Sequence, residues 1–334
     1  MLFLKILFLL LVYFDTRAQI LPAEGYGTVI MYHRFDEDKY EDTSISSELF
    51  RSHLEFLNNE GYNVLPISKL VDFYTNEVIL PKKSVFITID DGFKSFYDKA
   101  FPLLKKYQFP FTVFVSTDHV GKNNSSSFMT WDMLRELKLN GGTIHNHTSS
   151  HINMNEVTIK EANNSVIKAQ DSIKQELDFT SSVFSFPYGS SSIETEKLIK
   201  DLGFKISFGQ QSSHAVKNEN KFHLPRFAFN EQYGQMDRFK LIMKSFPLLT
   251  YEVSPKDRFL NLNTPNFGFS SDQSINDINC YHSSGLELKT QKIFPNRVEV
   301  RFISKPNKGR NRINCTLFDK DGNLFWYGRI LIYK

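Results

Sequence analysis

Between about residue 27 and residue 246, short β-rich apolar runs alternate with longer amphipathic stretches. Repeated strand–helix alternation is typical of a largely parallel sheet, because each helix carries the chain back to begin the next strand. Seven or eight such units favour a barrel, and the active site of a barrel lies at the carboxyl ends of its strands. The expected strands are 28–33, 62–66, 84–90, 111–116, 142–147, 183–186, 204–208 and 223–229. The expected helices are 47–60, 67–76, 95–107, 131–139, 159–177, 194–202 and 232–244, and N-caps are expected at Thr158 and Ser192.

The sequence changes character after about residue 250. Proline and asparagine punctuate an irregular stretch there, at Pro255, Asn261, Asn263, Pro265 and Asn266. Strands are then expected at 297–303, 312–319 and 324–333, with a hairpin turn signal at 319–323. We therefore expect an α/β domain over residues 19–250 and a small accessory all-β module over residues 251–334.

The first eighteen residues have the pattern of a secretion signal. Lys5 is the only early charge, an apolar run over 6–14 follows, and Ala18 is a plausible cleavage site. An exported protein is therefore expected, in the periplasm, outside the cell or at its surface, with an uncleaved N-terminal anchor as the alternative. Because such compartments are oxidising, Cys280 and Cys315 are expected either to form a disulfide or to remain two buried thiols.

The charge of the chain argues against one class of partner. The formal net charge is only +3, and the sequence has no long basic run. Nucleic acid is therefore not an expected partner. No transmembrane segment is expected beyond the N-terminal one, and the sequence predicts no oligomeric state.

Two adjacent carboxylates follow the apolar run 84–87, in the segment Thr88-Ile89-Asp90-Asp91-Gly92. Successive side chains of a strand point to opposite faces, so both carboxylates can serve one site only if the strand ends there. Gly92 permits such a turn. Asp-Asp-Gly is also a common turn sequence, but the apolar run before it favours a functional position at a strand end.

Three histidines follow further along the chain, in His145-Asn146-His147-Thr148-Ser149-Ser150-His151. Residues four apart share a face of a helical turn, so His147 and His151 could reach one metal ion. His145 could share a strand face with His147 and is the competing ligand. One Asp and two His ligands leave open positions on a metal, and a second Asp is left as a base, which are the parts that metal-assisted hydrolysis needs.

A third segment, Phe184-Ser185-Phe186-Pro187-Tyr188-Gly189, combines a strand end with a turn marked by Pro187 and Gly189. A backbone N–H in such a turn could bind a developing oxyanion.

Together, the three segments resemble the motifs of the polysaccharide deacetylase family, carbohydrate esterase family four. Residues 88–92 match its first motif with Ile89 in place of Phe, 147–151 match its second, and 187–189 match its third. The similarity covers roughly residues 27–246, and the segment 131–134 also fits. It implies a distorted (β/α) barrel that removes N-acetyl groups from an N-acetylglucosamine-containing polysaccharide.

The resemblance also implies roles for individual residues. Asp91, His147 and His151 would hold a divalent metal, while Asp90 would be the general base. The backbone N–H of Tyr188 would stabilise the oxyanion, and Pro187 and Tyr188 would contact the substrate. Zinc is the first expectation for the metal, with cobalt, nickel and iron(II) as alternatives.

Two departures from the family pattern affect these roles. Ser185 stands where the family often has an Arg, and Arg226 is expected to reach the base carboxylate instead. The usual Leu-x-His of the general acid is absent downstream of the third motif. Met31-Tyr32-His33 resembles the poly-N-acetylglucosamine deacetylase branch, where such a histidine is the acid, so His33 is nominated and His223 is the runner-up.

Three other functions are compatible with parts of this pattern. A related amidase could act on another N-acyl or ester substrate. A catalytically inactive glycan-binding protein is the second alternative, because the usual third-motif Arg is missing. An iron(II) oxygenase also uses two His and one carboxylate, but in a different order along the chain. In the C-terminal module, Trp326 and Tyr327 are expected to pack within a sheet, with stacking on sugar as the alternative.

Overall fold

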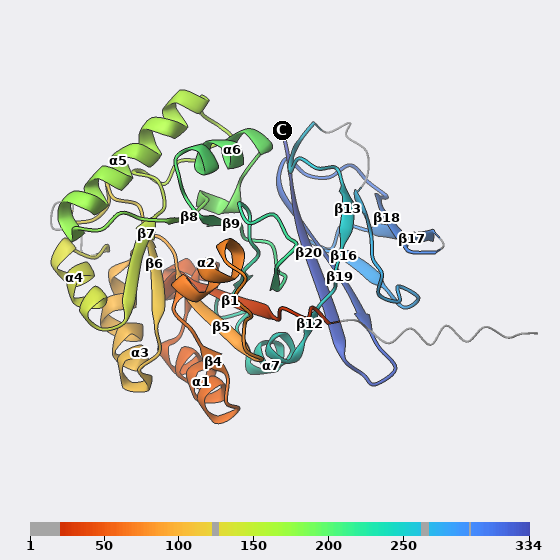
Figure 1. The fold of residues 1–334 in the computed structure, drawn as a ribbon, viewed down its shortest axis with the longest axis horizontal. Helices are drawn as coiled ribbons and strands as arrows, with labels where there is room; N and C mark the ends of the chain where they lie inside the picture. The colour runs from red at the N-terminus through yellow and green to blue at the C-terminus, as the bar shows by residue number, and fades with distance from the viewer. Residues whose placement is uncertain (1–20, 122–126, 262–266, 294) are drawn as a thin grey trace, which may run out of the picture.

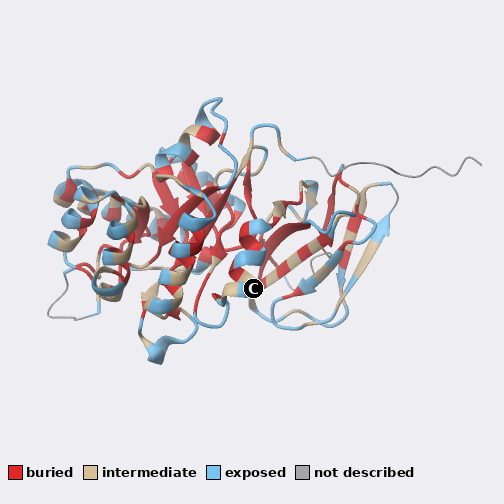
Figure 2. Cartoon of the chain, turned by 90° about the horizontal axis from the view of Figure 1, so that it is seen from below, coloured by how far each residue is buried: buried red, intermediate tan, exposed pale blue. Residues whose placement is uncertain are grey.

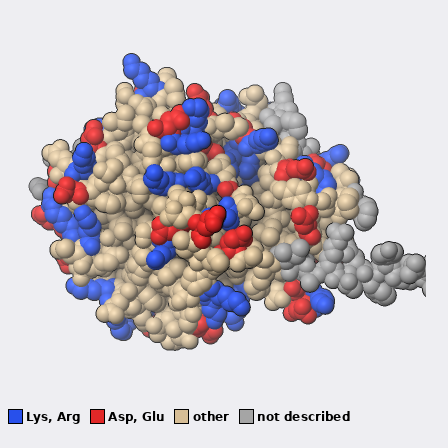
Figure 3. Space-filling view, viewed as in Figure 1, with Lys and Arg blue, Asp and Glu red and all other residues tan. Residues whose placement is uncertain are grey.

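The computed structural model describes residues 21–121, 127–261, 267–293 and 295–334 (Figure 1). The secretion signal expected at residues 1–18 lies outside this range. Within the described residues, no helix has the length and apolar character that a membrane crossing requires. On the face that Figure 3 shows, Lys and Arg side chains are interspersed with Asp and Glu.

A nine-stranded sheet forms the centre of the N-terminal part. Its main path runs β10-β1-β5-β6-β7-β8-β9, while β11 pairs with β1 and β4 pairs with β5. Every pairing is parallel except that of β1 with β10. The strands are β1 (Tyr26–Tyr32), β4 (Asn63–Val64), β5 (Ser84–Ile89), β6 (Phe111–Val115), β7 (Gly142–Asn146), β8 (Val183–Ser185), β9 (Ile206–Phe208), β10 (Ala215–Val216) and β11 (Phe227–Ala228).

The segment 224–228 connects the two ends of this sheet. Leu224 forms a parallel bridge to Phe208 at the end of β9, and Phe227 pairs with Ile30 of β1. The strand expected over 223–229 is therefore reduced to β11 and one bridge. The sheet curls into a distorted barrel, as expected, because short irregular pairings complete the circle between β9 and β1.

Helices cover the outside of the curled sheet (Figure 1). They are α1 (Ser47–Asn59), α2 (Ile67–Thr75), α3 (Phe101–Tyr107), α4 (Trp131–Leu139), α5 (Ile159–Leu177), α6 (Ile193–Asp201) and α7 (Met236–Lys244). Thr158 and Ser192 cap α5 and α6, each in a reciprocal capping box, which confirms both expected caps. The helix expected over 95–107 instead begins as a π-helix, Phe96–Ala100, and Pro102 stands in the first turn of α3. Proline has no N–H to donate within a continuous α-helix, which accounts for the change at this point.

The C-terminal part consists of two strand layers. The first has the order β12-β20-β19-β16 with β14 on β20, and the second has the order β13-β15-β18-β17. The strands are β12 (Phe246–Pro247), β13 (Tyr251–Ser254), β14 (Phe259–Leu260), β15 (Phe267–Ser270), β16 (Asn279–His282), β17 (Leu288–Ile293), β18 (Arg297–Phe302), β19 (Gly309–Phe318) and β20 (Leu324–Tyr333). The stretch expected to be irregular therefore contains several short strands. Their two to six residues are too few to show a clear alternation between apolar and polar positions.

A disulfide joins the first layer internally. Cys280 on β16 lies directly opposite Cys315 on β19, and the two are bonded. Of the two expectations for these cysteines, the disulfide is therefore the one observed.

Strand β20 attaches this module to the barrel. A Cβ added to Gly328 would lie 2.0 Å from the Ser212 carbonyl oxygen, so the two backbones are in direct contact there. The Trp326 ring packs edge-on against Phe227 of β11, with their centroids 5.5 Å apart. Trp326 and Tyr327 are both buried, so both pack within the protein. Figure 2 shows buried residues both in the barrel and along the strands of the module.

Candidate metal centre and active site

The adjacent carboxylates lie where β5 ends. Asp91 has a φ of +73° and Gly92 a φ of +80°, so two consecutive residues adopt the left-handed conformation. This conformation is costly for a residue with a Cβ, and such strain is found mainly at functional sites. The turn brings both carboxylates to the same end of the sheet, although they are neighbours in sequence.

Asp90 is completely buried and paired with Arg226, which is also completely buried. The two guanidinium NH groups donate to the two carboxylate oxygens, each at 2.7 Å. Arg226 also donates to the Gly209 carbonyl at 3.0 Å and to the Ser185 hydroxyl at 2.8 Å. Its charge lies 5.5 Å from the ring centroids of both Phe114 and Phe208. Arg226, in the segment just before β11, reaches the carboxylate beside the small Ser185 side chain.

This pairing controls the ionisation of Asp90. Burial alone would raise the pKa of the carboxyl, but the Arg226 guanidinium and then His147 hold it below its usual value. Asp90 is therefore ionised at neutral pH.

Asp91, His147 and His151 form the second cluster. Asp91 Oδ1 lies 3.3 Å from His147 Nε2 and 3.1 Å from His151 Nε2. One ligand atom from each residue lies within 4.8 Å of the other two. The two histidines do not lie on a helical turn, as the sequence predicted, but in a loop after β7. Positive φ angles of 65° at Thr148 and 56° at His151 fold this loop back, so that both rings face Asp91.

The atoms of this cluster fit a divalent cation. His147 Nδ1 donates to the Ser185 carbonyl oxygen at 2.7 Å, which leaves the lone pair of Nε2 directed toward Asp91. Asp91 Oδ1 and His147 Nε2 are both buried, and neither has a hydrogen-bond partner among the described residues. Two acceptors that face each other without a donor are costly, and a cation between them would compensate both. One carboxylate and two imidazoles are a donor set that zinc and related divalent metals accept.

His145 lies outside this cluster. It is buried on β7, where its Nδ1 lies 2.9 Å from the Ser181 hydroxyl. Burial lowers the pKa of its imidazole to about 3, so the ring is neutral. Its bond to Ser181 directs it away from the carboxylates, so His147 is the histidine that joins Asp91.

The two candidates for the general acid have different surroundings. His33 follows β1 and lies near the whole cluster. Burial lowers the pKa of its imidazole, while the charges of Asp91 and Asp90 act in the opposite direction. His223 Nε2 instead lies 3.1 Å from the Gly189 carbonyl oxygen, and His223 lines a separate cavity.

The third-motif turn, Pro187–Gly189, lies beside His151. Tyr188 adopts a φ of +61°, and its ring centroid lies 4.5 Å from that of His151. Pro187 is buried, whereas Tyr188 is exposed. The turn therefore places the Tyr188 peptide and side chain next to the candidate metal ligands.

The C-terminal module also reaches this turn, which the sequence did not predict. Arg310 of β19 donates to the Tyr188 carbonyl oxygen and to Gln210 Oε1, both at 3.1 Å. An open groove of about 1000 Å³ is lined by His151 and Tyr188 on one side and by Arg310 and Tyr333 on the other. No sequence signal could have assigned Arg310 to this site, because it lies far from the three motifs along the chain.

The fold and the site agree with comparisons to known proteins. Residues 77–207 match the family model described as polysaccharide deacetylase. The chain carries a polysaccharide deacetylase domain. This confirms the family that the three motifs predicted.

The deacetylase domain has similar proteins of named activity. A poly-beta-1,6-N-acetyl-D-glucosamine N-deacetylase of Staphylococcus aureus (strain MRSA252) is 25% identical over 228 residues, which cover 64% of this chain and 76% of the relative. Two solved structures share the fold. The Streptococcus pyogenes deacetylase PplD in complex with acetate has a TM-score of 0.60 and 21% identity, with 68% of this chain and 99% of that chain covered. IcaB from Ammonifex degensii has a TM-score of 0.58 and 23% identity, with 66% and 97% covered.

Proposed function

We propose that this protein is a metal-dependent deacetylase that hydrolyses N-acetyl groups of an exported N-acetylglucosamine polymer. The observation that carries the proposal is the pair of buried acceptors, Asp91 Oδ1 and His147 Nε2, which face each other without a donor beside the fully paired Asp90. The named activity of the Staphylococcus aureus relative supports the choice of polymer.

Asp91, His147 and His151 are the proposed ligands of the metal, with zinc as the first choice and cobalt, nickel or iron(II) as alternatives. When bound, the metal would supply an activated water and a polarised substrate carbonyl. The Ser185 carbonyl fixes the tautomer and orientation of His147 for this role.

Asp90 is the proposed general base. Because Arg226 keeps it ionised, it can take one proton from the attacking water. The bidentate contact also fixes the direction of the carboxylate, and Ser185 supports the guanidinium from the side. Arg226 thus has the role of a positioning residue.

Tyr188 and His33 complete the proposed reaction. The Tyr188 N–H donates to the oxyanion that forms at the acetamido carbon, and Pro187 shapes the turn against which the sugar lies. His33 donates a proton to the leaving amine as the carbon–nitrogen bond breaks. The products are acetate and a free amino sugar, so that one water is consumed for each acetyl group removed.

The contact between Arg226 and Asp90 argues against the inactive glycan-binding alternative. That alternative rested on the missing third-motif arginine, and Arg226 makes a bidentate contact with the base carboxylate from another part of the chain.

Acetate release by the metal-reconstituted protein tests the proposal. The substrates are poly-N-acetylglucosamine, chitin oligomers, peptidoglycan and acetylxylan, and the control is the same protein after chelation. We expect release from poly-N-acetylglucosamine that depends on the metal. Release from acetylxylan alone would contradict the proposed substrate, and release unaffected by chelation would contradict the proposed mechanism.

A further inference from the structure

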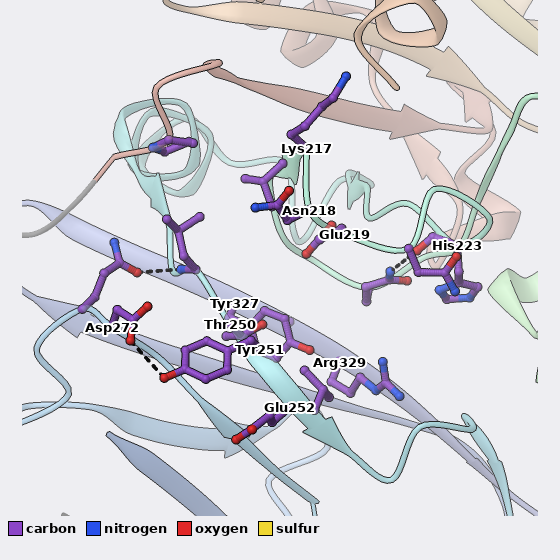
Figure 4. Close-up of a pocket in the computed structure, with 18 of the residues that line it drawn as sticks. Lys217, Asn218, Glu219, His223, Thr250, Tyr251, Glu252, Asp272, Tyr327 and Arg329 are labelled. Carbon is purple, nitrogen blue, oxygen red and sulfur yellow. Dashed lines mark hydrogen bonds between the residues drawn. The ribbon is translucent and has the colours of Figure 1, made fainter. Parts of the chain in front are cut away.

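A second cavity lies between the barrel and the β module, away from the metal centre. Its volume is about 610 Å³, within the range of about 300–1,000 Å³ that is usual for small-molecule sites. Figure 4 shows Glu219 and His223 from the loop after β10 on one side, with Tyr327 and Arg329 of β20 on the other. Both structural parts of the chain therefore contribute to its walls.

Four side chains that line this cavity are buried and have an unpartnered polar atom. These atoms are Gln211 Oε1, His223 Nδ1, Arg258 Nε and Arg329 Nε. The exposed fractions of these residues are only 6%, 2%, 7% and 7%, in the same order. Among the described residues, only the candidate metal centre gathers comparable unpartnered atoms, at Asp91 and His147. Because buried polar groups are normally paired, such a concentration points to a missing ligand.

The chemistry of the four atoms can be assigned from their neighbours. His223 Nε2 donates to the Gly189 carbonyl, so His223 Nδ1 is an acceptor. Gln211 Nε2 donates to the His223 carbonyl at 2.8 Å, which leaves Oε1 as a second acceptor. The two arginine Nε–H groups are donors. A ligand for this cavity must therefore both donate and accept hydrogen bonds, as sugar hydroxyls do.

The charges at the cavity favour an anionic group on that ligand. Arg258 is paired with Glu196 at 2.6 Å, whereas Arg329 donates to the backbone carbonyls of Pro255 and Lys256. Glu196 and Glu219 lie near enough for their charges to act on Arg329, but among the described residues no ion pair joins either carboxylate to it. Burial raises the pKa of the nearby Glu219 to about 8, so this carboxyl is neutral at pH 7 and does not balance the guanidinium. Two buried guanidinium groups thus share one ion-paired carboxylate, Glu196, and an anion would balance the remaining positive charge.

We propose that this cavity is a second saccharide site, which binds an acidic sugar unit. The sugar carboxylate accepts from the Nε–H groups of Arg258 and Arg329, and sugar hydroxyls donate to His223 Nδ1 and Gln211 Oε1. The site is distinct from the metal centre, although His223 in its wall contacts Gly189 of the third-motif turn. Binding there does not depend on the deacetylation proposed above, so either proposal can fail without the other.

Calorimetric titration of the full, metal-loaded chain with glucuronate tests this proposal. Glucose provides the same hydroxyls without the charge, and acetate provides the charge without the hydroxyls. We expect one glucuronate site and at least about tenfold weaker binding of glucose and acetate, since a charged hydrogen bond contributes about 1.5–3 kcal/mol. Arg329→Gln should weaken glucuronate binding about tenfold or more.

Arg312→Gln is the matched control. Arg312 is also an arginine with a buried, unpartnered Nε, but it does not line the cavity, so this variant should bind glucuronate as the wild type does. If Arg329→Gln does not fold, Gln211→Leu removes a single acceptor and should weaken binding several-fold. The proposal is overturned if the wild type does not bind glucuronate, if glucose or acetate binds equally well, or if a folded Arg329→Gln or Gln211→Leu variant binds it unchanged.

Discussion

The metal centre and the second cavity both contain buried polar atoms without a protein partner, but the atoms differ in kind. At the metal centre the unpartnered atoms are acceptors, Asp91 Oδ1 and His147 Nε2. In the second cavity they include the donors Arg258 Nε and Arg329 Nε. The first arrangement suits a cation and the second suits an anion. The charged groups to which the unpaired atoms belong thus indicate the charge of the ligand, whereas burial alone does not.

The Asp90–Arg226 pair differs from both, because the protein itself supplies the partner of each charge. It lies next to the metal centre and is fully buried, yet both carboxylate oxygens accept from the guanidinium. Such a pair needs no ligand to balance it. Substitutions at the metal centre, at the Asp90–Arg226 pair and at the second cavity should therefore differ in effect, and the largest effect is expected at the metal centre.

Removal of the metal ligand should have the largest effect. We expect Asp91→Asn to lose the metal and to reduce acetate release by about 10⁴-fold or more, because the metal supplies several kcal/mol of transition-state stabilisation. Metal content and acetate release are measured together. Asp171→Asn, at an exposed position of α5, is the control and should retain both. Full activity of a metal-free Asp91→Asn would remove Asp91 from the site.

Asp90→Asn should separate catalysis from metal binding. We expect acetate release to fall about 10²–10⁴-fold while the metal is retained, since only the general base is lost. The free energy of unfolding should also fall by about 3–5 kcal/mol, because Arg226 becomes an unpaired buried charge.

The double variant Asp90→Asn/Arg226→Met tests the predicted loss of stability from an unpaired Arg226. It should recover much of that stability, measured by denaturant unfolding, and none of the activity. Unchanged turnover in Asp90→Asn would exclude Asp90 as the base.

Arg310→Ala tests whether the β module contributes to the metal centre. Loss of the contact to the Tyr188 carbonyl should lower kcat about tenfold with a smaller change in KM, because one hydrogen bond to a charged group is lost and the turn is loosened. Arg310→Lys should restore part of the rate. A change in KM alone would instead place Arg310 among the residues that only bind substrate.

Glu219→Gln should have the smallest effect on acetate release, and its effect should instead be seen in the pH dependence of stability. The pKa of Glu219 is raised to about 8 in the folded chain, despite the opposing charges of Arg258 and Arg329. The unfolded carboxyl has a pKa of about 4.3, so between about pH 4.3 and pH 8 the folded state binds more protons and stability falls as pH rises. Glu219→Gln should lack this decrease, and it should gain stability relative to the wild type at pH 8 but not at pH 4. An identical pH profile of unfolding for the two proteins would contradict the raised pKa.

The sequence predicted the barrel because each of its features is local. The apolar run before Asp90 and the two helix N-caps act within a few residues, and the structure contains them where they were expected. The short strands β13 to β16 were missed because each of them pairs with strands that are not its neighbours in sequence. Strand β17 was also missed, although it forms a hairpin with β18. The helical turn expected for His147 and His151 was wrong because their shared direction comes from positive φ angles in a loop, which spacing alone does not reveal.

The contacts around the site likewise divide into those that local sequence predicts and those that it does not. The structure places Asp91 beside the two histidines that the motif spacing selected, because the segments that carry them follow strands of one parallel sheet. The support that Ser185 gives to His147 through a backbone carbonyl, and the contact of Arg310 with Tyr188, join segments far apart in sequence. Such contacts depend on packing between parts of the fold, which no local pattern records. The second cavity was missed for the same reason.

The location of a bound metal tests the central claim most directly. Crystals of the zinc-reconstituted protein, with anomalous diffraction recorded on both sides of the zinc edge, would locate the ion. We expect one strong peak per chain, about 2.0–2.2 Å from Asp91 Oδ1 and from the Nε2 atoms of His147 and His151. A zinc peak elsewhere, or none at this cluster in zinc-saturated protein, would contradict the account.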